Sequence, residues 1–234
     1  MNVSPITLDA IKLVARRLDY LREDFVLVGG AVTGLLLTNT AIPQIRTTLD
    51  IDVIVEIASR SDYYALESRL QRLGFRSLIG EGIPLCRWVV DDVIVDIMPT
   101  DPRILGFSNA WYSATIDNAT AISLEDNLQV RIASPPYFLA TKIEAFHGRG
   151  QNDYVTSSDI EDIITLIDGR EELVQEIEGG SQELKSFLAA AFEYMASKEA
   201  FIESLSCHLL PDEASQSRVE FITRQIHEII KLGK

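Results

Sequence analysis

The segment Arg46–Val55 reads RTTLDIDVIV and places two aspartates at the start of a run of β-branched residues. Valine and isoleucine favour extended structure, so Asp50–Ile57 is predicted to be a strand. Side chains alternate along a strand, so Asp50 and Asp52 face the same way. Two carboxylates on one face repel each other, and a bound divalent cation that prefers oxygen ligands, such as magnesium, would offset the repulsion. The simpler alternative is a solvated strand end.

A second predicted strand carries a third aspartate. Leu85–Val90 and Val93–Met98 are rich in β-type residues and are separated by two aspartates, which predicts a hairpin. Asp96 shares a face with apolar side chains, and burying its carboxylate there is costly unless it is paired or bound to metal. If this strand neighbours the first one, the three aspartates form a triad. The alternative is that Asp96 is an edge-strand charge that discourages aggregation.

A glycine pair lies upstream of the first two aspartates. Phe25–Val28 is a short apolar run predicted to be a buried strand, Gly29 and Gly30 follow it, and Ala31–Thr38 has a helical pattern. Glycines before a helix let a phosphate approach backbone N–H groups. The pair fits neither the P-loop nor the dinucleotide-binding fingerprint, and a plain tight turn is the alternative.

Together the glycine turn and the aspartates suggest one chemistry, which is the binding of a nucleoside triphosphate with two Mg²⁺ ions. One metal would lower the pKa of an attacking hydroxyl, and the other would stabilise the triphosphate and the pyrophosphate leaving group. Asp96 would bind a metal and accept the hydroxyl proton.

Composition bounds the remaining possibilities. The chain has 234 residues, of which 47% are hydrophobic and 24% charged, as in ordinary globular proteins. Its pattern predicts an α/β (α+β) fold, in which a small mixed sheet flanked by helices occupies residues 1–133 and a helical domain occupies residues 134–234. The nucleotide is expected in a cleft between the two. Two cysteines without ligand spacing argue against a structural zinc site and against a disulfide framework.

The charge balance bears on partners. The chain has 21 basic and 35 acidic residues, a net charge of −14, which is unlike that of a general nucleic-acid binder but permits a narrow basic groove. No apolar stretch reaches the length of a membrane span, so we expect no membrane association and a cytoplasmic location. The residues available for a narrow basic surface are Arg103, Arg131, Lys142, Arg149 and Arg170.

With these residues the sequence resembles the AbiEii-type nucleotidyltransferases, the toxin-related branch of the minimal, polymerase-β-like nucleotidyltransferase superfamily. The resemblance spans about Val26 to Arg170. It rests on Val28-Gly29-Gly30, Arg46–Val53, Val95-Asp96, Leu139–Phe146 and Ser158–Ile163.

The resemblance implies a nucleotidyltransferase fold and the transfer of NMP from an NTP to an acceptor, which is tRNA in the studied toxins, with an antitoxin protein as a partner. It implies that Gly29 and Gly30 form the phosphate loop. It implies metal binding and catalysis by the triad of Asp50, Asp52 and Asp96. Lys142 and Asp159 match residues that contact the nucleotide, with Asp162 close to them.

Other interpretations stay open. Lys142 could be an ordinary surface lysine, and Asp159 a helix-dipole residue beside a capping box formed by Ser158 and Glu161. The acceptor could be a small molecule or a protein side chain, and the chain could be a non-catalytic nucleotide-binding module. Retention of all three aspartates argues against such a module, because unpaired clustered carboxylates cost stability.

Overall fold

The structure is a computed structural model that describes residues 2–39, 42 and 46–234. The described chain divides into two compact units. The sheet unit comprises residues 3–34 and 46–134, and the helical unit comprises residues 135–234 together with residues 2, 35–39 and 42. The glycine pair and the three aspartates belong to the sheet unit, whereas Lys142 and Asp159 belong to the helical unit.

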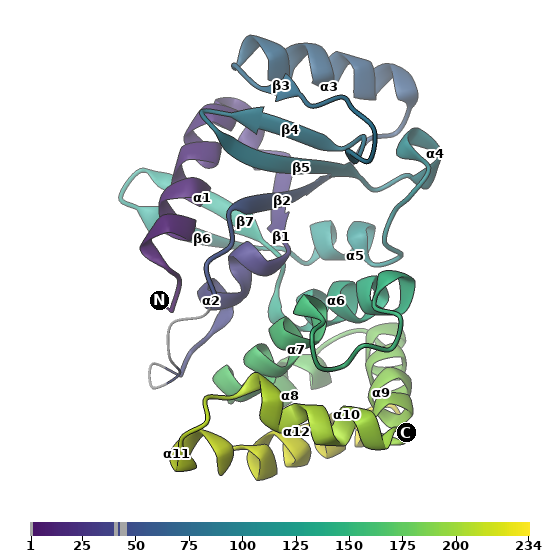
Figure 1. Ribbon diagram of the computed structural model, residues 1–234. Coiled ribbons are helices and arrows are strands. Elements are labelled where there is room, and N and C mark those ends of the chain that lie inside the picture. The colour runs from purple at the N-terminus through teal and green to yellow at the C-terminus, as the bar shows by residue number, and fades with distance from the viewer. Residues whose placement is uncertain (1, 40–41, 43–45) are drawn as a thin grey trace. The chain divides into compact units, whose positions relative to one another are not determined.

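Seven strands of the described chain form one mixed sheet in the order β3-β4-β5-β2-β1-β7-β6 (Figure 1). Strand β2 is antiparallel to β1 and parallel to β5, and β1 is parallel to β7. The strands are β1 (Phe25–Val28), β2 (Asp50–Val55), β3 (Arg76–Ser77), β4 (Arg87–Val90), β5 (Val93–Pro99), β6 (Thr120–Glu125) and β7 (Leu128–Ile132). A mixed sheet with helices confirms the predicted fold class.

Amphipathic helices accompany the sheet in the first part of the chain. In α1 the side chains of Ile11, Val14 and Leu18 are buried at helical spacing, and the hydroxyl of Ser4 caps the helix by accepting a hydrogen bond from the backbone N–H of Thr7 at 3.1 Å. The helices of this part are α1 (Pro5–Leu18), η1 (Asp19–Glu23), η2 (Gly30–Val32), α2 (Thr33–Leu36), α3 (Arg60–Arg72), α4 (Pro102–Leu105) and α5 (Tyr112–Asp117).

The helical unit is built around α7. Its isoleucines Ile160, Ile163, Ile164 and Ile167 are fully buried, and α7 packs against α6 and α12 (Figure 1). The unit contains α6 (Pro135–Arg149), α7 (Ser158–Gly169), α8 (Leu173–Glu178), α9 (Gln182–Ala196), α10 (Glu199–Ser204), η3 (Leu205–His208), α11 (Glu213–Gln216) and α12 (Val219–Lys231). None of the helices in the described ranges combines the length and apolar character that crossing a bilayer requires.

One predicted helix is much shorter than expected. The sequence pattern predicts a helix over Ala31–Thr38, but the chain forms a 3₁₀ turn over Gly30–Val32 and a single α-helical turn over Thr33–Leu36. The segment contains a glycine and β-branched residues, which have low helix propensity, and this explains why the helix does not extend. The predicted hairpin is present, with its two turn aspartates at φ 45° and 65°, as a type I′ turn requires.

Candidate functional site

The register of the central strands puts the three aspartates on one face of the sheet. Asp52 of β2 lies opposite Asp96 of the parallel strand β5 and opposite Val28 of the antiparallel strand β1. Directly opposed residues share a face of the sheet, and so do alternate residues of one strand. Asp50, Asp52 and Asp96 therefore form a same-face group, which we call the triad. The predicted triad depended on these two strands being neighbours, and β2 and β5 are paired in the sheet.

Gly29 and Asp52 touch. Gly29 follows β1 directly and has a φ of 69°, a conformation that side chains rarely adopt. A Cβ added to it would lie 1.9 Å from Oδ2 of Asp52, so the carboxylate fills the space that a side chain would need. Gly30 is buried and begins η2. The glycine turn is thus required both by the backbone conformation and by the close approach of a triad carboxylate.

Sequence reasoning missed one residue of this face, Arg87. It lies on β4 opposite Asp96, and its guanidinium binds that carboxylate through both oxygens, with Nε 2.9 Å from Oδ1 and Nη2 2.7 Å from Oδ2. Nη2 also lies 3.5 Å from Oδ2 of Asp50. Such two-pronged, charge-assisted bonds are among the stronger hydrogen bonds in proteins. The hydrogen bonds to Asp96 raise the pKa of Arg87, although its partial burial opposes the shift.

Burial explains why Asp96 needs this partner. The side chain of Asp96 is only 12% exposed, that of Arg87 26% and that of Asp50 43%. A carboxylate removed from water is costly unless a charged or hydrogen-bonding partner replaces the solvent. One guanidinium therefore pairs with both oxygens of Asp96 and lies near one oxygen of Asp50.

The donor set fits a magnesium site in its chemistry. Carboxylate oxygens on one face, beside a glycine turn without side chains, are the hard ligands that magnesium prefers. Within the described ranges, however, no three acidic, histidine or cysteine side chains converge as closely as one ion demands. The cation that contacts Asp50 and Asp96 is the guanidinium of Arg87.

Cys86 is the neighbour of Arg87 in the chain and is buried. Burial, with a further contribution from the negative charge of Asp96, raises the pKa of its thiol to about 12. The thiol is therefore neutral at physiological pH. A buried, neutral thiol acts as a small apolar residue and not as a nucleophile.

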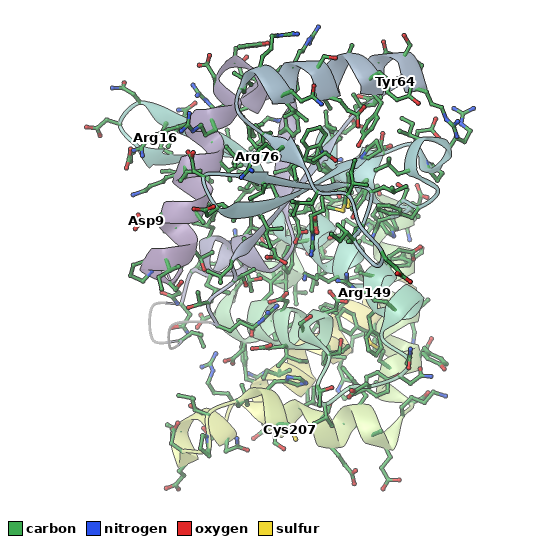
Figure 2. All side chains as sticks on the ribbon, turned by 45° about the horizontal axis from the view of Figure 1, so that its top comes forward. Asp9, Arg16, Tyr64, Arg76, Arg149 and Cys207 are labelled. Atoms are coloured by element: carbon green, nitrogen blue, oxygen red, sulfur yellow. The ribbon has the colours of Figure 1, made fainter. Side chains whose placement is uncertain are left out.

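The predicted nucleotide contacts of the helical unit form a buried ion network between α6 and α7. Nζ of Lys142 lies 2.6 Å from Oδ2 of Asp162 and 3.2 Å from Oδ1 of Asp159. Arg149, at the C-terminal end of α6 and labelled in Figure 2, donates from Nε and Nη2 to the two oxygens of Asp159, each at 2.9 Å. The side chain of Lys142 is 7% exposed, so its interpretation as an ordinary surface lysine is wrong.

The network stabilises the charged form of Asp159. Burial by itself would raise the pKa of Asp159, but the hydrogen bonds from Arg149 and the charge of Lys142 outweigh it and lower that pKa. The exposed member is Arg149, whose side chain is 69% exposed. The predicted capping residue was wrong by one position, because the hydroxyl of Ser157, and not that of Ser158, caps α7.

Three of the candidate basic residues have partners elsewhere. Arg103 pairs with Asp101, Arg170 pairs with Glu176, and Arg131 donates to the backbone carbonyls of Glu23 and Ile116.

Comparison with known proteins adds the fold. The structure resembles the crystal structure of an antigenic nucleotidyltransferase-like protein from Paracoccidioides brasiliensis, with a TM-score of 0.50, 22% sequence identity, and coverage of 87% of this chain and 94% of the other. The fold is nucleotidyltransferase-like. The crystal structure of JHP933 from Helicobacter pylori matches with a TM-score of 0.46, 14% identity, and coverage of 99% of this chain and 91% of the other. No family model matches the sequence, and neither does any curated protein.

Proposed function

We propose that this chain is a Mg²⁺-dependent nucleotidyltransferase that transfers NMP from an NTP to an acceptor hydroxyl. The observation that carries the proposal is the same-face triad of Asp50, Asp52 and Asp96 in direct contact with the glycine turn at Gly29. The nucleotidyltransferase-like fold supports it.

Each residue of the site has a role in the proposed reaction. Asp50, Asp52 and Asp96 would hold magnesium, which when bound would supply Lewis-acid stabilisation of the triphosphate and of the attacking hydroxyl. The turn at Gly29 and Gly30 presents backbone to the phosphates without side chains in the way. The acceptor oxygen attacks the α-phosphorus, the bond from that phosphorus to the bridging oxygen breaks, and pyrophosphate leaves. Asp96 takes the hydroxyl proton.

The helical unit supplies further phosphate contacts in this proposal. Lys142 and Arg149 carry the positive charges, and Asp159 and Asp162 hold them in place. Arg149 is the member that is largely exposed, so it can reach a phosphate without first leaving a buried position. Lys142 would have to exchange a carboxylate for the phosphate.

The resemblance to AbiEii-type enzymes favours tRNA as the acceptor and a toxin role with a protein antitoxin as partner. A small hydroxyl compound or a protein side chain is the second candidate acceptor. The net charge of −14 favours this second candidate, because an acidic surface attracts cationic small molecules and repels RNA. The acceptor is therefore the part of the proposal that needs direct measurement.

A non-catalytic module is a stronger competitor than the sequence suggested. Three clustered aspartates without partners would cost stability. Arg87 compensates two of them, so the cluster persists without a metal ion at a lower cost. Transfer of a labelled nucleotide distinguishes an enzyme from such a module.

The deciding experiment is label transfer. The protein is incubated with Mg²⁺, each α-labelled NTP in turn, and total tRNA, a protein extract or a panel of cationic small molecules. We expect label on one acceptor class, and a loss of at least about 100-fold in Asp52→Asn, since removal of a metal or proton-transfer group costs about that much or more. Asp117→Asn, at an exposed position outside the site, is the matched control. Transfer that survives in Asp52→Asn would overturn the proposed site, and NTP binding without transfer would favour the non-catalytic module.

A further inference from the structure

A fixed positive charge already occupies the face that the proposed function assigns to metal ions. Both oxygens of Asp96 accept hydrogen bonds from Arg87, at 2.9 and 2.7 Å, and the same guanidinium contacts Asp50. A carboxylate bound in this way has its negative charge balanced by a cation that belongs to the chain itself.

We propose that Arg87 is the resident counter-cation of the triad, which positions Asp96 while no metal is bound and releases it when a divalent cation binds. The inference rests on the proposed function, and it makes Arg87 a positioning residue with two states. In one state the guanidinium neutralises Asp96 and Asp50. In the other, those oxygens bind the metal ion, and the guanidinium no longer occupies them.

The two states exclude each other on electrostatic grounds. A guanidinium and a divalent cation carry charges of the same sign, and they repel strongly at the short separation that sharing one carboxylate imposes. Asp96 needs one of them, because its side chain is 12% exposed and would otherwise be a buried charge without a partner.

Arg87 binds Asp96 more closely than Asp50, and this difference would help a divalent cation to replace the guanidinium. The bonds to Asp96 are short and paired, whereas the contact with Asp50 is 3.5 Å long and involves a carboxylate that is 43% exposed. A cation from solvent can thus reach Asp50 first and then compete for Asp96. The Arg87 side chain is 26% exposed, so after release its charge can move towards solvent at the edge of the site.

Magnesium binding, measured by calorimetry without any NTP or acceptor, tests the exchange. We expect Arg87→Met to bind Mg²⁺ at least tenfold more tightly than the unmodified protein, because no guanidinium competes. The same variant should unfold at a lower temperature without Mg²⁺ and recover most of the difference when Mg²⁺ is added. Arg76→Met, an exposed arginine on the adjacent strand β3, is the control and should change neither quantity. Unchanged or weaker Mg²⁺ binding in Arg87→Met overturns the proposal.

A second measurement does not depend on Arg87→Met folding. In the ¹⁵N spectrum of the unmodified protein, the Arg87 Nε–H signal, identified by its loss in Arg87→Lys, should shift during a Mg²⁺ titration with the dissociation constant found by calorimetry. A signal that stays fixed while Mg²⁺ binds would mean that Arg87 keeps its bonds, and the two-state role fails. If the shift occurs but no NTP is ever transferred, the proposed function fails and the exchange at Arg87 stands.

Discussion

At the scale of single residues, Gly29 offers the sharpest test of the site's geometry. An alanine at this position must adopt a φ of 69° and must also displace the Asp52 carboxylate, which lies 1.9 Å from where its Cβ would be. The left-handed conformation alone costs about 1–2 kcal/mol. We expect Gly29→Ala to lose more unfolding free energy than that in urea denaturation, and to bind Mg²⁺ more weakly because Asp52 is pushed aside.

Gly74 is the matched control for this substitution. It has a φ of 92° and nothing within 4 Å of the place that a Cβ would occupy, so alanine there meets the conformational strain alone. The difference between the two alanine variants therefore isolates the contact with Asp52. Equal losses in both variants would contradict the close approach on which the site is built.

Asp159 makes a prediction about pH. Its pKa in the folded protein is lowered, so its charged form contributes stability above the ordinary carboxyl value of 3.8. That contribution is lost as the pH falls through the lower folded value. We expect the unfolding free energy of the unmodified protein to fall faster, as the pH drops below about 4, than that of Asp159→Asn. At pH 7 the variant should be about 3 kcal/mol less stable, since a buried ion pair has lost one partner.

Asp117→Asn, at an exposed position, is the control for this pH profile. The burial-raised pKa of Asp168 acts in the opposite direction over the same titration, so only the difference between Asp159→Asn and the unmodified protein is informative. Parallel profiles for those two proteins would show that the ion network around Asp159 does not stabilise the fold.

At the scale of elements, the β4–β5 hairpin holds the key pairing of the site. Its turn residues Asp91 and Asp92 both have positive φ, and Asp91 is paired with Arg17 at 2.6 Å. Asp92→Gly creates an Asp-Gly turn, which type I′ geometry favours, and we expect a gain of about 0.5 kcal/mol. Alanine adopts a positive φ less readily than aspartate does, so Asp92→Ala should lose about 1 kcal/mol of unfolding free energy. Thermal unfolding of the two variants measures both effects, and a more stable Asp92→Ala would contradict the turn assignment.

The same hairpin shows how much of the site could be predicted from the sequence. A two-residue turn at positions 91 and 92 fixes the register, so Arg87 has to face Asp96, and that pairing could have been deduced from the turn residues alone. The strands β1, β2, β4 and β5 were predictable because each is a run of β-type residues bounded by turn residues. The pairing of β2 with β5 could only be assumed, because the sequence does not say which strands become neighbours.

Other features depend on tertiary packing that no local pattern encodes. Lys142 reads as a surface residue in isolation, and it becomes buried because α7 docks on α6 and brings two aspartates to its ammonium group. The short strand β3 has only two residues, too few for a periodic signal. The helix after Gly30 was overestimated because apolar residues outweighed the low helix propensity of glycine and β-branched residues.

At the scale of the whole molecule, several charged side chains are paired with nearby groups of opposite charge. The excess of acidic residues is met at the triad by one arginine and between α6 and α7 by a lysine and an arginine. Arg103, Arg131 and Arg170 are likewise held by acidic side chains or backbone carbonyls. At each of these six basic residues, a phosphate would have to compete with a partner that is already bound.

Because these basic residues are already paired, we can predict how the binding of an RNA acceptor would depend on salt. A protein that makes about two phosphate contacts loses only about tenfold in affinity between 50 and 200 mM salt, whereas six to ten contacts cost about 10³–10⁵-fold. We expect tRNA, if it is the acceptor, to show the shallow dependence in equilibrium binding with Mg²⁺ held constant. Arg149→Ala should flatten the slope further, because Arg149 is the exposed cation of the α6–α7 network, whereas Arg76→Ala should leave it unchanged. A steep slope would contradict this expectation, and tRNA binding too weak to measure would favour a small cationic acceptor over RNA.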